Sequence, residues 1–148
     1  MKYLMYLAAS IALFCAAPLA VVAQPASCSV VVHVSGFRNQ KGELGVAVFS
    51  SPDGWPEAND NAFFHKDFPI NGDASTAQFT LPQGRYAIAV LHDENENHKL
   101  DKNFMGVPKE GFGFSNNPKV GLSAPGFDSA AFQFSCQSTE VSIRLIYK

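Results

Sequence analysis

Apolar and polar residues alternate along most of the chain after its first two dozen positions. The pattern appears at 28–34 ("CSVVVHV") and recurs at 43–49, 76–81, 85–92, 131–136 and 140–147. A period of two is typical of β-strands with one face toward a core. Turn-forming segments such as "NQKG" and "PQG" separate these stretches. We therefore predict six strands, with a seventh around "FHKDFPI" at 64–70.

These short strands, without a long helix between them, predict an all-β fold: an antiparallel two-sheet sandwich of about seven strands. The segment 54–68 ("GWPEANDNAFFHKDF") does not alternate. Its Pro56 suits a first helical turn, so we expect a short helix or an irregular crossover there. Trp55 is interpreted as a core or crossover plug, with a ligand platform as the alternative.

A long segment, 103–127, is rich in glycine, proline and phenylalanine and shows no strand pattern. Long loops without secondary structure are uncommon in compact domains and are usually functional or disordered. The phenylalanines favour order, because they need a surface to pack on. Either the loop covers one end of the core, or it forms a ligand surface. The residues concerned are Phe104, Phe112, Phe114 and Phe127 for the cover, and Phe104, Phe112, Phe114 and Glu110 for the ligand surface.

The N-terminus has the features of a secretory signal peptide at 1–23: Lys2, an apolar stretch, and a small-residue cleavage site ending at Ala23. The mature domain would then be 24–148. Removal of Lys2 changes the formal net charge from −2 to −3. We expect a periplasmic or secreted protein with no membrane span after cleavage, and no nucleic-acid partner.

Two cysteines, Cys28 and Cys136, remain after cleavage. An even pair in an exported chain predicts a disulfide, although Cys28 could instead be lipid-modified. Both cysteines are in register with apolar residues, so we expect the bridge to cross the interior. Closing so long a loop contributes on the order of 4 kcal/mol in the chain-entropy model.

The stretch "HDENENHKLDKN" at 92–103 follows an apolar strand and carries oxygen-bearing residues at alternate positions. Calcium prefers 6–8 oxygen ligands, which such spacing directs to one centre. The predicted ligands are the side chains of Asp93, Asn95, Asn97 and Asp101 and the carbonyl of Lys99. The alternative is a polar turn held by its own hydrogen bonds, with no ion.

The calcium pattern is incomplete. Position 6, normally glycine because of its positive φ, is His98, and position 12, normally a bidentate glutamate, is Phe104. Waters or a remote group such as Glu110 would complete the shell, and affinity should fall to roughly 0.1–1 mM. A transition-metal site using His92 and His98, with Met105, is a further alternative.

The stretch "LPQGRYAIAVLHDENENHKLDKNFMGVPKEGFGFSNN" at 81–117 resembles a bacterial exported family catalogued as a domain of unknown function, DUF2141. The resemblance extends to "VSGFRNQKGELGVAVF" and "VSIRLIY". It implies a small secreted or periplasmic sandwich of transthyretin-like kind. The family pattern has glycines at the positions of Glu96 and His98, a departure that weakens a cation site in this chain. No established activity comes with the resemblance.

We therefore expect a non-catalytic binding or structural module of the cell envelope, with a small ligand, glycan or envelope protein as partner. The alternative is a small hydrolase-type enzyme, an analogy that rests on fold alone. An enzyme would need His65 or His92 within hydrogen-bond reach of a carboxylate or hydroxyl in a pocket. No nucleophile motif is present in the sequence.

Overall fold

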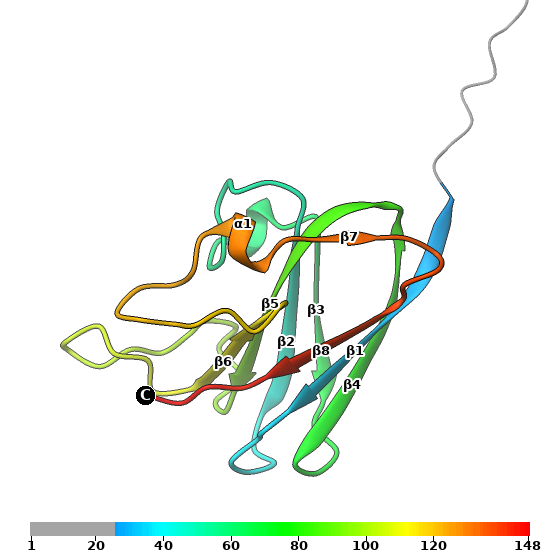
Figure 1. Ribbon diagram of the computed structural model, residues 1–148. Helices are drawn as coiled ribbons and strands as arrows, with labels where there is room; N and C mark the ends of the chain where they lie inside the picture. Colours follow the sequence, from blue (N-terminus) through cyan, green and yellow to red (C-terminus); the bar gives the residue numbers. More distant parts are fainter. Residues whose placement is uncertain (1–25) are drawn as a thin grey trace, which may run out of the picture.

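Two β-sheets pack face to face in the computed structural model, which describes residues 26–148 (Figure 1). The predicted signal peptide at 1–23 lies outside the described residues. The smaller sheet has the order β4 (Ala74–Pro82), β1 (Ser27–Ser35), β8 (Glu140–Arg144). The larger sheet has the order β3 (Phe64–Pro69), β2 (Glu43–Phe49), β5 (Gly84–Asp93), β6 (Gly111–Phe114). The short β7 (Phe132–Phe134) pairs with the other end of β5.

The predicted all-β sandwich, including the seventh strand around 64–70, is therefore confirmed. One part of the prediction is wrong: β1 and β8 run parallel, so the sandwich is not wholly antiparallel. Two parallel strands need a crossover connection between them. Here the chain forms the strands of the larger sheet after β1 and before β8. Within residues 26–148, no helix combines the length and hydrophobicity needed to cross a membrane.

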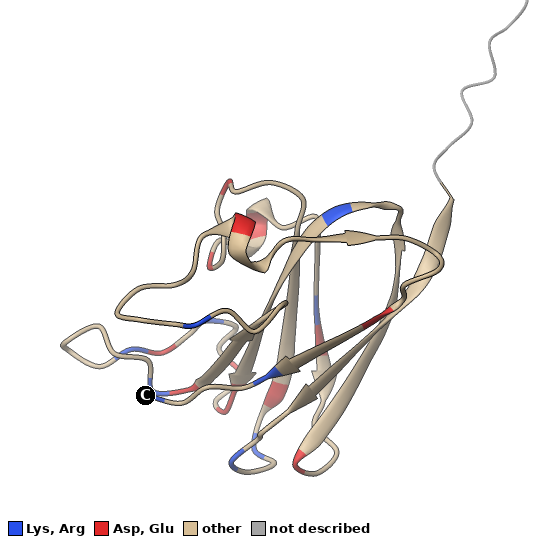
Figure 2. Ribbon diagram, in the orientation of Figure 1, with Lys and Arg blue, Asp and Glu red and all other residues tan. Residues whose placement is uncertain are grey.

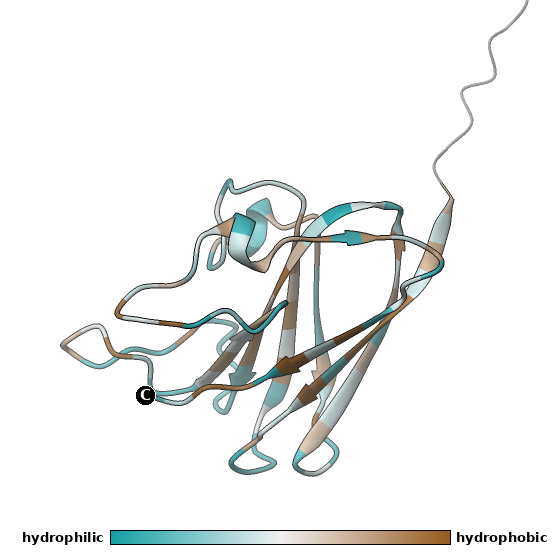
Figure 3. Cartoon of the chain, in the orientation of Figure 1, coloured by the Kyte–Doolittle hydropathy of each residue, from teal (hydrophilic) through white to brown (hydrophobic). Residues whose placement is uncertain are grey.

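The main core lies between the sheets and follows the predicted alternation. Every second residue of β1, namely Val30, Val32 and Val34, is buried, while the intervening His33 is exposed. The same holds on β4. Figure 3 shows brown, hydrophobic segments on β1 and β8 next to paler and teal ones.

The larger sheet is apolar on its outer face as well. A second buried cluster lies there, formed by Ala47, Phe49, Ala87, Ala89, Phe112, Phe114, Phe127 and Ala130. The segment 50–63, with the short 3-10 helix η1 (Asn59–Asn61), and the segment around α1 (Phe127–Ala130) cover this face (Figure 1). Trp55 packs edge-on to Phe49 at 5.4 Å and donates from Nε1 to the Pro125 carbonyl at 2.8 Å. It is the plug that the sequence predicted.

The expectation that 103–127 lacks a strand is wrong, because β6 lies within it. In "GFGF" the two phenylalanines face the outer cluster and the two glycines face the other way. A β-carbon on Gly111 would lie 2.5 Å from the Tyr147 ring, and one on Gly113 would lie 2.7 Å from Ile143. Glycine is required there because neighbouring side chains fill the space. The expected end cover is also wrong for Phe104, which is 96% exposed.

The predicted disulfide joins Cys28 and Cys136, with their Cα atoms 5.5 Å apart and 108 positions between them in sequence. Its expected location is wrong, because it does not cross the interior. Cys28 is half-buried near the start of β1, and Cys136 is exposed in the turn between β7 and β8. The bridge ties the first strand to the turn that carries the chain from the larger sheet to the smaller one.

Replacing both cysteines (Cys28→Ser with Cys136→Ser) should lower the free energy of unfolding by about 4 kcal/mol, because the unfolded chain regains the entropy of an open loop. Urea denaturation of the double variant measures this. Wild-type protein treated with a thiol reductant should show the same loss. A change below about 1 kcal/mol in both would contradict a stabilising role for the bridge.

Candidate functional site: a groove beside the acidic loop

A groove with a volume of about 910 Å³ opens on the outer face of the larger sheet. Strands of the larger sheet form its floor, and two loops form its walls. The floor includes Gly45, Ala89, Leu91, Phe112 and Phe114, and the walls include Leu100, Met105, Val107, Val120 and Leu122. The loops that contain 97–108 and 118–124 extend together from the same side of the sandwich in Figure 1.

The walls carry large apolar side chains that remain exposed. Met105 is 68% exposed, and Leu122 is fully exposed. Both line the groove, whereas Phe104 beside Met105 points away from it. Two predicted ligand-surface residues, Phe112 and Phe114, lie in the floor. Exposed apolar residues that surround a concave site are typical of a binding surface.

Acidic groups and histidines lie at one end of the groove. His98 Nδ1 lies 3.1 Å from Glu43 Oε1 and 3.3 Å from Asp67 Oδ2. His65 Nε2 lies 3.7 Å from Asp67 Oδ1. Burial, and then the neighbouring carboxylate of Asp67, raise the pKa of Glu43, while His98 acts in the opposite direction. Sequence reasoning missed Glu43 and Asp67, because only the strand register brings them beside the loop.

The predicted calcium ligands form a closed set of hydrogen bonds. Asp93 is buried and accepts from the backbone N–H groups of Asn97 and His98, at 3.2 and 2.6 Å. The Asn95 and Asn97 amides donate to the two oxygens of Asp101, at 2.8 and 3.1 Å. The Asn97 side-chain oxygen accepts from the N–H of Lys99. The loop thus brings four predicted ligand side chains together and satisfies each of them internally.

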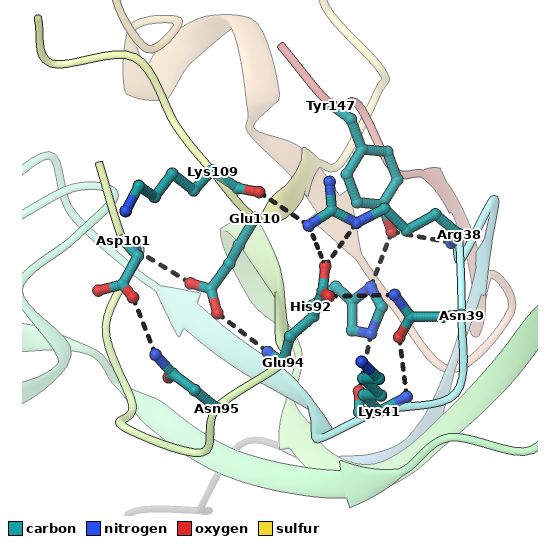
Figure 4. Close-up of polar contacts among 10 residues, drawn as sticks. All are labelled: Arg38, Asn39, Lys41, His92, Glu94, Asn95, Asp101, Lys109, Glu110 and Tyr147. Atoms are coloured by element: carbon teal, nitrogen blue, oxygen red, sulfur yellow. Dashed lines mark hydrogen bonds and ion pairs between the residues drawn. The ribbon is translucent and has the colours of Figure 1, made fainter. Parts of the chain in front are cut away.

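Glu110 lies under this loop as a buried carboxylate (Figure 4). It accepts from the N–H of Glu94 and the N–H of Asp101, both at 3.0 Å. These residues are at opposite ends of the loop, so one side chain closes it. The Glu110 carboxylate therefore binds backbone N–H groups. It does not belong to the open ligand surface that was predicted for it.

Glu94 anchors the loop on its other side (Figure 4). Its carboxylate accepts from Arg38 Nε at 2.6 Å and from the Asn39 amide at 3.0 Å. Burial acts to raise the pKa of Glu94, but the hydrogen bonds from Asn39 and Arg38 and the charge of Arg38 outweigh it, so the pKa is lowered. The carboxylate stays ionised and holds the loop to the segment after β1.

His92 is a buried structural residue and not a metal ligand. Its Nε2 lies 2.9 Å from the Lys41 carbonyl, which can only accept, so Nε2 carries the hydrogen. In the neutral ring, Nδ1 then accepts from the Tyr147 hydroxyl at 2.8 Å. Both ring nitrogens are engaged, so neither is free for the predicted alternative of a transition-metal site with His92, His98 and Met105.

The groove is lined by both positively and negatively charged side chains. Lys99, Lys102 and Lys148 line it together with the acidic groups. Lys102 is paired with Glu57 at 2.6 Å, and Lys148 donates to the Val120 carbonyl. Over the described chain, Lys and Arg are interspersed with Asp and Glu on several strands and loops (Figure 2).

Glu110→Ala should lower the free energy of unfolding by about 2–4 kcal/mol, because two backbone N–H groups lose a charged acceptor. Glu110→Gln should cost less, since its oxygen can still accept one of them. Urea denaturation measures the loss, and hydrogen exchange should accelerate at the amides of Glu94 and Asp101. The control is Glu57→Ala, which breaks an exposed ion pair and should change stability by less than about 1 kcal/mol. Equal effects of the two alanine variants would contradict the closing role of Glu110.

A family model described as an uncharacterized protein conserved in bacteria (DUF2141) matches residues 32–142. No curated protein and no solved structure is significantly similar to the chain. The matched residues run from within β1 to within β8 and include the acidic loop, Glu110 and all the residues that line the groove except Lys148. The chain belongs to the bacterial DUF2141 family.

Proposed function

We propose that this protein is an exported, non-catalytic binding module of the cell envelope, which holds a small and mainly apolar ligand in the groove. The observation that carries the proposal is the groove itself. Its volume of about 910 Å³ and its apolar floor with a few polar groups at one end are typical of small-molecule sites. A glycan or an envelope protein that inserts an apolar group is the other class of partner.

Export is the second part of the proposal. A disulfide persists in oxidising compartments such as the periplasm, and the Cys28–Cys136 bridge agrees with the predicted signal peptide. The stability expected from the bridge would be lost in a reducing cytoplasm.

The groove supports binding better than hydrolysis. His92 is buried outside the groove, and His65 is 3.7 Å from Asp67, beyond hydrogen-bond distance. His98 does lie in the groove, 3.1 Å from Glu43, so hydrolysis would depend on whether a nucleophile is near it. Among the residues that line the groove, Ser123 is the one hydroxyl side chain, and it lies on an exposed loop. Within the described residues, no hydrogen bond connects Ser123 to a histidine that could activate it.

Weak calcium binding by the acidic loop is a further part of this proposal. The oxygens of Asn95, Asn97 and Asp101 lie in one loop, but an ion must first displace their mutual hydrogen bonds. That cost agrees with the low affinity expected from two carboxylates. A bound ion would stiffen the loop that forms one wall of the groove.

The groove can be tested with an apolar fluorescent probe such as anilinonaphthalene sulfonate. Ala89→Phe should weaken its binding at least tenfold, because the ring occupies the floor of the groove. Trp55, the chain's one tryptophan, gives a second signal, since it contacts Phe114 in the floor.

The matched control is Thr76→Phe, which adds the same ring to an exposed position on β4 of the other sheet. It should leave probe affinity unchanged. The proposal fails if both variants bind the probe as well as wild type does, or if both lose it equally while their melting temperatures stay the same.

The calcium loop can be tested by calorimetric titration of chelator-treated protein. We expect a dissociation constant of roughly 0.1–1 mM and a rise in melting temperature at saturating calcium. Asn95→Ala should weaken binding about tenfold by removing a predicted ligand. Glu96→Gln removes a nearby charge but no predicted ligand, and should have a much smaller effect. If calcium gives neither a heat of binding nor a rise in melting temperature with wild-type protein, the polar turn is the correct interpretation.

A further inference from the structure

Three residues from different parts of the chain meet at the polar end of the groove. Glu43 begins β2 and pairs with Asp93 at the end of β5, and the acidic loop folds His98 back over both. One donor atom from each lies within 4.8 Å of the other two. We propose that Glu43, Asp93 and His98 bind a divalent first-row transition-metal ion. This site goes beyond the proposed ligand groove and does not depend on it.

The donor spacing fits a coordinated ion. Ligand atoms about 2.0–2.1 Å from a tetrahedral zinc ion lie roughly 3.3 Å from each other. His98 Nδ1 lies 3.1 Å from Glu43 Oε1 and 3.3 Å from Asp67 Oδ2. A single imidazole nitrogen carries at most one hydrogen, so it cannot serve both carboxylates fully. A cation could instead be bound by His98, Glu43 and Asp93 at once, because one donor atom of each lies within 4.8 Å of the others.

An independent observation concerns Glu43. Its Oε1 atom is buried, yet it accepts no hydrogen bond from any group in the described residues. Buried polar atoms are nearly always satisfied, and one left without a donor is unfavourable. This oxygen is the one nearest His98 Nδ1. A metal ion at this position would satisfy it.

The backbone places His98 beside the carboxylates. His98 has φ 59°, in the left-handed region that favours glycine. Its N–H donates to Asp93 Oδ2 at 2.6 Å, which holds the residue beside the carboxylates. A residue held in an unfavourable backbone conformation at a cluster of ligand groups is a reason to look for a role of its side chain.

The donor set distinguishes this site from the calcium loop. One imidazole with carboxylates suits zinc, copper, nickel or iron better than calcium, which prefers oxygen ligands alone. The calcium loop uses the oxygens of Asn95, Asn97 and Asp101, none of which belongs to the new site. Asp93 is the one side chain that both sites would use.

The test is calorimetric titration of tag-free, chelator-treated protein with Zn²⁺. We expect one ion per chain with micromolar affinity. His98→Gly removes the imidazole and places glycine at a positive φ, so the fold should be retained. His98→Gly and Glu43→Gln should each weaken Zn²⁺ binding at least tenfold, with the metal-free melting temperature of His98→Gly unchanged or raised.

Two matched controls locate the ion. His33→Ala removes an exposed histidine on the other sheet, and Asn95→Ala removes a calcium-loop ligand; both should bind Zn²⁺ like wild type. The proposal is overturned if wild type does not bind Zn²⁺, if His98→Gly or Glu43→Gln binds it normally, or if Asn95→Ala loses it. Probe binding in the groove is measured separately, so failure of one proposal leaves the other testable.

Discussion

The larger sheet is apolar on both faces, and this constraint organises the rest of the molecule. Its inner face packs against the smaller sheet, and its outer face would expose the cluster around Phe49, Phe112 and Phe114 to water if nothing covered it. The segments around Trp55 and Phe127 supply that cover. The groove opens beside these segments, with buried residues such as Ala89 and Phe112 in its floor. The candidate binding site is therefore a consequence of how the second apolar face is buried.

The acidic loop depends on the same sheet. It begins at the end of β5, and the buried carboxylate of Glu110, next to β6, closes it from below through two N–H groups. Glu94 holds it to the segment after β1 through Arg38. Because both anchors are charged acceptors in partly buried positions, the loop keeps a defined shape without an ion. The wall of the groove that this loop forms is thus fixed by the sheet's own strands.

Much of the sandwich can be predicted from sequence because alternation reports burial directly, as Val30, Val32 and Val34 illustrate. Alternation fails in two ways here. In β6 the inward positions are glycines, so apolar and polar residues do not alternate. The sequence therefore predicts a loop there. In β5 the outward Ala87 and Ala89 are also buried, so the pattern does not reveal a groove. The acidic loop was recognised from its local spacing. Its neighbours Glu43 and Asp67 were not, since register between distant strands leaves no mark in a single sequence.

The positions of Glu96 and His98 connect the family pattern with the proposed ion. Both have positive φ, at 58° and 59°, which gives a physical reason for the glycines that the family resemblance implies there. The Glu96 side chain is exposed, so glutamate in place of glycine adds only a negative charge. At His98 the side chain enters a space bounded by three carboxylates, those of Glu43, Asp67 and Asp93. The three carboxylates carry a formal charge of −3, which a dication would reduce to −1.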